Sequence, residues 1–222
     1  IWSAGRASVT ACYGCHGMTF SKICGLRDAS DAEFAVSQGV DAIGLNLHPS
    51  SPRYVSPDLA RAIADRVRDR ARVVVLCVDL EREAVEALIH QIKPDVLQFH
   101  GAESDAFYAS FGCPFWKAVP VRASDSVVMA ASRYPSAEAL LVDTPSTRVA
   151  GGTGKRFDWS LVPRVMKRSG FLAGGLDPDN VAEAITAVRP YGVDVASGVE
   201  TERGLKSRPL MKAFLEAVRG AG

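Results

Sequence analysis

From residue 18 onward the chain repeats one pattern, in which a short apolar run is followed by a segment with helical spacing of its apolar residues. Apolar runs bounded by turn residues predict buried strands, and apolar positions at i, i+3 and i+4 predict a helix with one buried face. The predicted strands are 20–24, 41–47, 72–78, 95–99, 114–119, 138–143, 170–174 and 192–196.

The segments between these strands carry helix-start signals. Ser30-x-x-Glu33 has the pattern of a capping box, and Ser56-Pro57 combines a serine cap with a first-turn proline. Ser207 precedes the last predicted helix in the same way. The helical pattern is weaker in 103–111, 124–133 and 159–167.

Eight strand–helix units in a chain of this length predict a single-domain (β/α)₈ TIM barrel over residues 18–222. Residues 1–17 show no such periodicity and precede Met18, a plausible start. We expect them to be a disordered or spurious extension of the barrel.

One motif within the extension has an alternative interpretation. Cys12, Cys15 and His16 have the C-x-x-C-H spacing of c-type haem attachment. Haem attachment also requires export, a second axial ligand and a fold that encloses the haem, and the sequence carries no signal for them. We therefore expect neither a haem nor another cofactor.

Charge and cysteine usage narrow the class of protein. Lys and Arg total 26 against 25 Asp and Glu, so the net charge of +1 gives no reason to expect nucleic acid or an anionic membrane as partner. No apolar run reaches the roughly 18 residues of a membrane-spanning helix. Five cysteines are an odd number, and Cys77 lies in a buried apolar run, which indicates a reducing, cytoplasmic location.

The carboxyl ends of barrel strands share one rim, where barrel enzymes place their chemistry. The loops after strands 2 and 6 are the longest, and long loops at this rim usually recognise substrate. The polar residues at this rim are Cys24, Asn46, His48, Arg53, Asp79, His100 and Asp143.

Glycine-rich loops follow the last three strands. Backbone N–H groups of such loops can bind phosphate, and barrels commonly hold a phosphate after strands 7 and 8. The segment 151–155 lacks the spacing of a P-loop, and a flexible loop is the alternative there. The candidate phosphate-binding residues are Gly152, Gly154, Gly174, Gly175, Ser197 and Gly198.

Two further rim residues are open to more than one interpretation. His100 could be a ligand, a base or a packed residue, and we place it with the substrate-binding residues. No second His or carboxylate stands at metal-ligand spacing from it, so we expect no metal. Arg53 could be a surface charge, or its planar fork could bind a carboxylate at the barrel mouth.

Seven motifs in order resemble the phosphoribosylanthranilate isomerase family. They are K-I-C-G, S-P-R-Y-V-S, Q-F-H-G, L-L-V-D-T, G-G-T-G-K-x-F-D-W, G-G-L-x-P-x-N-V and V-D-x-x-S-G-V-E, and they extend from Lys22 to near the C-terminus. The resemblance implies a (β/α)₈ barrel of tryptophan biosynthesis. It also implies conversion of N-(5-phosphoribosyl)anthranilate to 1-(2-carboxyphenylamino)-1-deoxyribulose 5-phosphate, an Amadori rearrangement without a cofactor.

The resemblance also implies roles for individual residues. Cys24 matches the general base, Asp143 the general acid, and Arg53 the residue that holds the anthranilate carboxylate. The glycine-bearing loops match the phosphate site. An acid near neutral pH needs a carboxyl pKa raised from about 3.9, and a thiol base needs a pKa lowered from about 8.5.

The sequence departs from the family pattern at two places. The family often has two serines where this chain has Ala196-Ser197, and we expect the alanine to cost one phosphate hydrogen bond. Ser207 replaces an aspartate that is frequent after Lys206, and serine caps a helix equally well.

Three rival functions are a related isomerase of the histidine pathway, a non-catalytic binding protein that kept the pocket, and a haem-carrying fusion. The histidine-pathway enzymes use an aspartate at the end of strand 1, where this chain has Cys24. Intact Cys24, Asp143 and Arg53 argue against a decayed site. The sequence leaves the choice between monomer and homodimer open.

Overall fold

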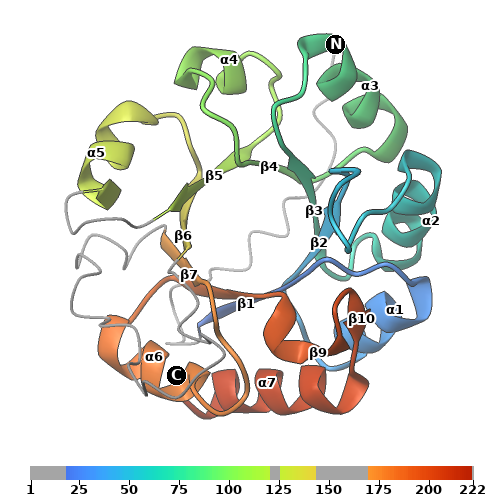
Figure 1. Cartoon of the computed structure of the whole chain (residues 1–222), viewed down its shortest axis with the longest axis vertical. Coiled ribbons are helices and arrows are strands. Elements are labelled where there is room, and N and C mark those ends of the chain that lie inside the picture. The colour runs from blue at the N-terminus through green and yellow to red at the C-terminus, as the bar shows by residue number, and fades with distance from the viewer. Residues whose placement is uncertain (1–18, 121–125, 144–169, 222) are drawn as a thin grey trace.

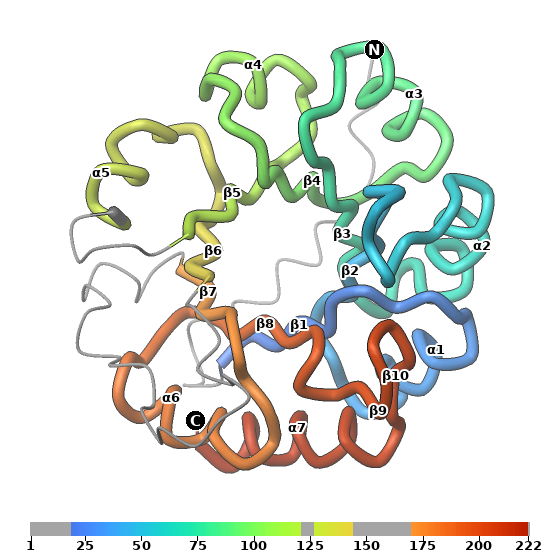
Figure 2. The backbone as a smooth tube through the Cα atoms, in the orientation of Figure 1, coloured from blue at the N-terminus to red at the C-terminus, as the bar shows by residue number. Residues whose placement is uncertain are grey.

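The computed structural model describes residues 19–120, 126–143 and 170–221, which form a closed barrel of eight parallel strands surrounded by helices (Figure 1). Consecutive strands pair with each other, and β8 pairs with β1 to close the ring (Figure 2). The strands are β1 (Phe20–Cys24), β2 (Ala42–Asn46), β3 (Arg72–Cys77), β4 (Val96–Phe99), β5 (Phe115–Pro120), β6 (Ala139–Asp143), β7 (Gly170–Ala173) and β8 (Gly192–Val195).

The predicted (β/α)₈ barrel is therefore confirmed, and each observed strand lies within or close to its predicted range. Helices lie outside the ring in the described part of the chain (Figure 1). They are α1 (Ala29–Ser37), α2 (Pro57–Val67), α3 (Arg82–Ile92), α4 (Asp105–Ala109), α5 (Ser126–Arg133), α6 (Val181–Val188) and α7 (Arg208–Gly220).

The loop between β8 and α7 has structure of its own. A 3-10 turn, η3 (Ser197–Val199), follows β8 and leads into an antiparallel hairpin of β9 (Glu200–Glu202) and β10 (Leu205–Lys206). This hairpin stands at the carboxyl-end rim, because it directly follows the end of β8. It brings charged residues to the mouth of the barrel.

The apolar residues form two separate cores, as the alternation of side chains along a strand requires. The larger core lies between the strands and the helices, and Ile23, Leu97 and Phe214 belong to it. The smaller core fills the inside of the barrel with residues such as Phe20 and Trp116. Strand residues of opposite parity thus face opposite sides of the barrel wall.

An ion pair lies at the amino ends of the strands, at the opposite end of the barrel from the carboxyl-end rim. Arg72 begins β3, and its guanidinium contacts the carboxylate of Glu138, just before β6, at 2.7 Å and 2.9 Å. The guanidinium also lies over the ring of Trp116, with 5.5 Å to the centroid. A bidentate pair therefore joins the amino ends of β3 and β6.

Two of the three predicted helix caps are confirmed and one is wrong. Ser56 accepts from Leu59 N at 3.3 Å, and Ser207 caps α7. Asp28, and not Ser30, caps α1: its carboxylate accepts from the backbone N–H of Ser30 at 2.8 Å. A carboxylate two residues upstream is a charged acceptor that favours the positive helix terminus, so the helix starts earlier than the capping box predicted.

Several sequence predictions fall outside the described residues. They are the 1–17 extension with Cys12, Cys15 and His16, the glycine loop with Gly152 and Gly154, and the helix expected over 159–167.

Candidate active site

Cys24 is the last residue of β1 and is buried, with 6% of its surface exposed. Its partner in the register of β2 is Gly44, and a Cβ added there would lie 2.8 Å from the Cys24 sulfur. A glycine at this point therefore gives the thiol the space that any other residue would fill. Gly25 follows in the left-handed region, with φ of 77°, and turns the chain away from the strand.

A buried ion pair lies next to the thiol inside the barrel. Lys22 and Cys24 share a side of β1, and Lys22 Nζ is 2.9 Å from Asp194 Oδ1 of β8. Lys22 is fully buried, so its charge requires the aspartate. Burial alone would lower the pKa of Lys22, but Asp194 and Cys24 raise it, which keeps the lysine charged.

The environment of the thiol works against the lowered pKa that a thiol base needs. Burial raises the pKa of Cys24, and Asp194 adds to this effect. Lys22 and Lys206 act in the opposite direction without overcoming burial. Two cations therefore favour the thiolate, but burial outweighs them and favours the protonated form.

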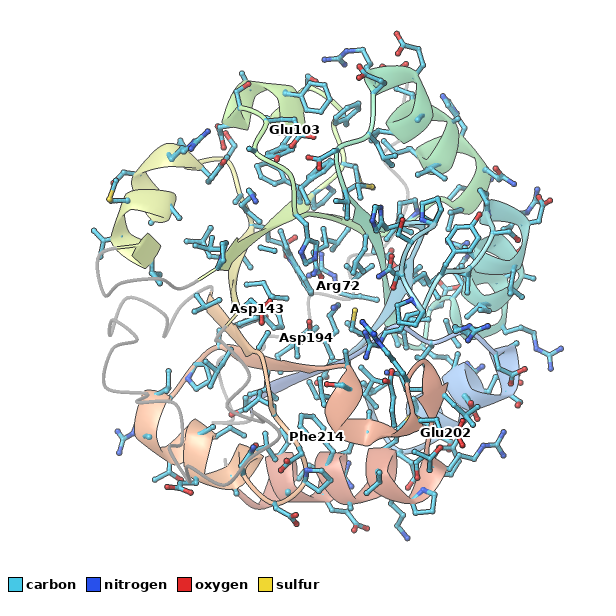
Figure 3. All side chains as sticks on the ribbon, in the orientation of Figure 1. Arg72, Glu103, Asp143, Asp194, Glu202 and Phe214 are labelled. Atoms are coloured by element: carbon cyan, nitrogen blue, oxygen red, sulfur yellow. The ribbon has the colours of Figure 1, made fainter. Side chains whose placement is uncertain are left out.

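Asp143 is the last residue of β6 and points to the same rim. Figure 3 shows Asp143 and Asp194 inside the ring of strands. Asp143 keeps an exposed edge at the mouth, yet the surrounding protein desolvates the carboxyl and raises its pKa, and the Asp194 charge adds to the shift. This direction is the one that a general acid needs.

Arg53 lies in the loop after β2 and faces the hairpin after β8. Its Nε and Nη2 donate to the two carboxylate oxygens of Glu200 at 2.7 Å and 2.8 Å. Lys206 Nζ donates to the same carboxylate at 2.8 Å. Burial alone would raise the pKa of Glu200, but hydrogen bonds from Arg53 and Lys206 lower it to about 2.

His100 follows β4 and sits at the rim with an exposed edge. Its Nε2 is 2.9 Å from Nε2 of Gln98, a buried residue of β4. Desolvation, together with the cations Lys22 and Lys117, lowers the pKa of His100 to about 4. The imidazole is therefore neutral at pH 7 and offers a polar, uncharged edge to a ligand.

We expect the His100 resonances to titrate near pH 4 in an NMR pH series, assigned by their loss in His100→Asn. The unfolded chain binds a proton at this residue near pH 6.5, and the folded chain does so only near 4. His100 therefore makes the fold less stable as the pH falls from 6.5 toward 4. A midpoint at or above 6.5 would contradict the placement of His100 beside buried cations.

The loops after β7 and β8 are in direct contact. Gly174 and Gly175 have φ of 85° and 65°, a conformation that glycine adopts most readily. A Cβ on Gly198 would lie 1.8 Å from the carbonyl oxygen of Leu176, so the two loops can approach only because residue 198 is glycine. The structure thus brings Gly174, Gly175, Ser197 and Gly198 to one part of the rim.

Comparison with known proteins shows the family of this chain. The family model described as N-(5'-phosphoribosyl)anthranilate isomerase matches residues 21–217. The chain belongs to the phosphoribosylanthranilate isomerase family. Proteins of that name from Pseudomonas fluorescens strain Pf-5 and Marinomonas sp. strain MWYL1 are 45% and 41% identical, over 90% and 89% of this chain and 95% and 97% of theirs.

Solved structures of the family have the same fold. The phosphoribosylanthranilate isomerase of Thermotoga maritima is 35% identical, with a TM-score of 0.83 over 91% of this chain and 100% of that one. A family structure in complex with reduced 1-(o-carboxyphenylamino)-1-deoxyribulose 5-phosphate has a TM-score of 0.81 and 33% identity, with the same coverage.

Relative to the family motifs, sequence reasoning missed the charged partners of the site. Lys22, Asp194 and Glu200 stand inside the family motifs, and Lys206 lies six residues beyond the last motif, yet none of them was assigned a role from the sequence. A usable signal existed for Lys22 and Asp194, because a charged residue at an inward position of an apolar strand needs a partner. Glu200 and Lys206 lie in a loop, where charge alone predicts nothing.

The described part of the chain contains no group of three or more His, Cys, Asp or Glu residues placed to hold a metal ion. In the same residues, no helix is both long enough and apolar enough to cross a membrane.

Proposed function

We propose that this chain catalyses the isomerisation of N-(5-phosphoribosyl)anthranilate to 1-(2-carboxyphenylamino)-1-deoxyribulose 5-phosphate in tryptophan biosynthesis. Membership of the family supports this reaction. The observation that carries it is the placement of a buried thiol and a carboxyl of raised pKa on one barrel rim, with the Lys22–Asp194 pair interacting with both.

In this proposal Asp143 delivers a proton to the ring oxygen of the aminoaldose, and the C1–O bond breaks to give a Schiff base. The Cys24 sulfur then takes the proton from C2, and the electron pair moves to form an enolamine. Tautomerisation of the enolamine gives the ketone. Substrate and product are isomers, so the step needs no oxidant, reductant or cofactor.

The cations at the rim suit the charge that develops. Cys24 must be a thiolate before it can accept a proton, and Lys22 and Lys206 both favour the thiolate. The thiol proton must therefore be lost to solvent before the C2 proton is taken, and Lys22 and Lys206 stabilise the thiolate that remains.

Substrate recognition divides between two parts of the rim. We propose that the loops carrying Gly174, Gly175, Ser197 and Gly198, with Gly152 and Gly154, bind the phosphate. The close approach of the loops after β7 and β8, where Gly198 lies against Leu176, supports this assignment. We also propose that Arg53 binds the anthranilate carboxylate and that His100 contacts the substrate as a neutral group.

Arg53→Lys should raise KM about tenfold or more, although the charge is kept. The guanidinium uses two donors on Glu200 and has others for a ligand, whereas an ammonium cannot hold two carboxylates in the same planar geometry. Steady-state kinetics with phosphoribosylanthranilate measure this effect. An unchanged KM would remove Arg53 from substrate binding.

The decisive experiment for the function follows the loss of phosphoribosylanthranilate fluorescence with purified protein. Turnover is the expected result; its absence in folded protein would favour the non-catalytic binding protein. The aminoaldose of the histidine pathway, tested in parallel, distinguishes the second rival, and visible absorbance tests the haem. The same assay on a chain beginning at Met18 tests our proposal that 18–222 is the catalytic unit.

We further infer a cytoplasmic location. The cysteines of the described residues, Cys24, Cys77 and Cys113, are all unpaired, as expected in a reducing compartment. The oligomeric state stays open between monomer and homodimer, and sedimentation equilibrium distinguishes them.

A further inference from the structure

The backbone of Arg53 is held firmly in the loop after β2. Its N–H donates to Ser51 Oγ at 3.1 Å, and Val55 N donates to Asn46 O at 2.9 Å, so the loop folds back on the end of β2. The aliphatic stem then crosses Gly25, where an added Cβ would lie 2.4 Å from Arg53 Cδ. The arginine side chain therefore passes directly over the turn that follows Cys24.

The far end of this side chain is held by Glu200. The carboxylate takes the edge of the guanidinium formed by Nε and Nη2, at 2.7 Å and 2.8 Å. The side chain of Glu200 is 4% exposed and that of Arg53 is 19% exposed, so solvent competes little for these hydrogen bonds. Two residues 147 positions apart in the sequence thus form one planar, bidentate unit.

Glu200 is itself fixed from behind. Lys206 Nζ donates to it at 2.8 Å and also to Ala196 O at 2.7 Å, and Gly204 N donates to it at 3.2 Å. The carboxylate therefore accepts from an arginine, a lysine and a backbone amide. With its acceptor positions filled, it has no free position for a substrate group.

A guanidinium has five N–H donors in a fixed plane, and Glu200 takes two of them. Within residues 19–120, 126–143 and 170–221, Arg53 Nη1 has no hydrogen-bond partner. One Nη1 hydrogen and the second Nη2 hydrogen form the end of the fork, which is a second edge suited to a carboxylate.

We propose that Glu200 is a positioning residue: it occupies the Nε–Nη2 edge of Arg53 and thereby aims the Nη1–Nη2 edge at the carboxylate of the substrate. This inference rests on the proposed role of Arg53 in binding that carboxylate. Glu200 does not touch the substrate, and it acts by holding the arginine in one orientation before binding, which reduces the entropy lost on binding.

The alternative is that the pair only fastens the β9–β10 hairpin to the loop after β2. Loss of a fastening would lower the melting temperature, but it would leave the preference of the site for a carboxylate unchanged. The discriminating quantity is therefore the ratio of two dissociation constants. The ratio is the dissociation constant of reduced 1-(phenylamino)-1-deoxyribulose 5-phosphate, which lacks the ring carboxylate, divided by that of reduced 1-(o-carboxyphenylamino)-1-deoxyribulose 5-phosphate, which carries it.

The experiment measures this ratio by calorimetry for wild type, Glu200→Gln, Arg53→Ala and the double variant. Glutamine can accept on one side only and turns an NH2 group toward donors, so it cannot hold the guanidinium edge. Glu202→Gln is the matched control, because Glu202 lies on the same strand β9 and its side chain is exposed.

We expect Glu200→Gln to lower the ratio about tenfold, and to raise KM far more than it changes kcat. In Arg53→Ala the two dissociation constants should become similar, so the ratio should fall close to one. The double variant should have the same ratio as Arg53→Ala, and Glu202→Gln should have the wild-type ratio. If Glu200→Gln keeps the wild-type ratio while Arg53→Ala brings it close to one, the inference is overturned and the proposed function stands. A wild-type ratio in Arg53→Ala instead removes the proposed role of Arg53.

Two measurements apply if Glu200→Gln does not fold. Glu200→Asp keeps the charge on a shorter side chain, and it should lower the ratio in the same direction. In wild-type protein, the ¹⁵N NMR signal of Arg53 Nε should stay in place when the carboxylate ligand binds, while the Nη signals change. A ligand that displaces Glu200 would move the Nε signal, and that result also overturns the inference.

Discussion

Cys24→Ala should lower kcat by two or more orders of magnitude while binding of the substrate largely persists. General-base catalysis is worth about 10²–10⁴ in rate, and alanine has no group that can take the C2 proton. The thiol lies beside Lys22 in a space that Gly44 leaves open, so the smaller side chain disturbs little else. Steady-state kinetics, with the melting temperature measured alongside, test the prediction.

Cys113→Ala provides the control, because Cys113 precedes β5 at the amino ends of the strands, away from the rim. It should turn over like wild type. The raised pKa of Cys24 adds a second signature: kcat/KM of the wild type should climb toward alkaline pH as the thiolate forms. If Cys24→Ala turns over within tenfold of wild type, Cys24 is not the base.

Asp143→Asn should be comparably damaging, with a loss of about 10²–10⁴ in kcat, because the amide keeps the shape of the carboxyl but cannot deliver the proton. Desolvation by the surrounding protein and the charge of Asp194 raise the pKa of Asp143, so the acid form persists to higher pH than in an ordinary aspartate. Above that value the loss of the acid form should offset the gain of thiolate, so wild-type kcat/KM should level off, whereas in Asp143→Asn it should keep climbing with pH.

Stability separates the catalytic effect of this variant from damage to the fold. A carboxyl whose folded pKa is raised costs stability above that pKa, because the fold disfavours its charged form, and the cost disappears at lower pH. Asp143→Asn should therefore melt at the same or a higher temperature at pH 7. Asp65→Asn, on the outer face of α2, is the control with unchanged turnover. Full activity in Asp143→Asn would assign the acid role to another group.

The sequence by itself determined the architecture of this protein and the address of its site. Apolar runs alternating with helical spacing are local patterns, and they predict strands and helices because burial of one face has a fixed period. Once eight such units are counted, closure into a barrel places every strand end on one rim, which is why Cys24 and Asp143 could be predicted as neighbours in function.

The tertiary structure decided how those residues are held and charged. Lys22 pairs with Asp194, which lies 172 positions away in the sequence, and Arg53 pairs with Glu200, which lies 147 positions away. Neither pairing has a local signature, since only closure of β8 on β1 and the path of the β9–β10 hairpin bring the partners together. The pKa of Cys24 depends in the same way on burial within the closed barrel, and burial outweighs the neighbouring cations that a reading along the strand would stress.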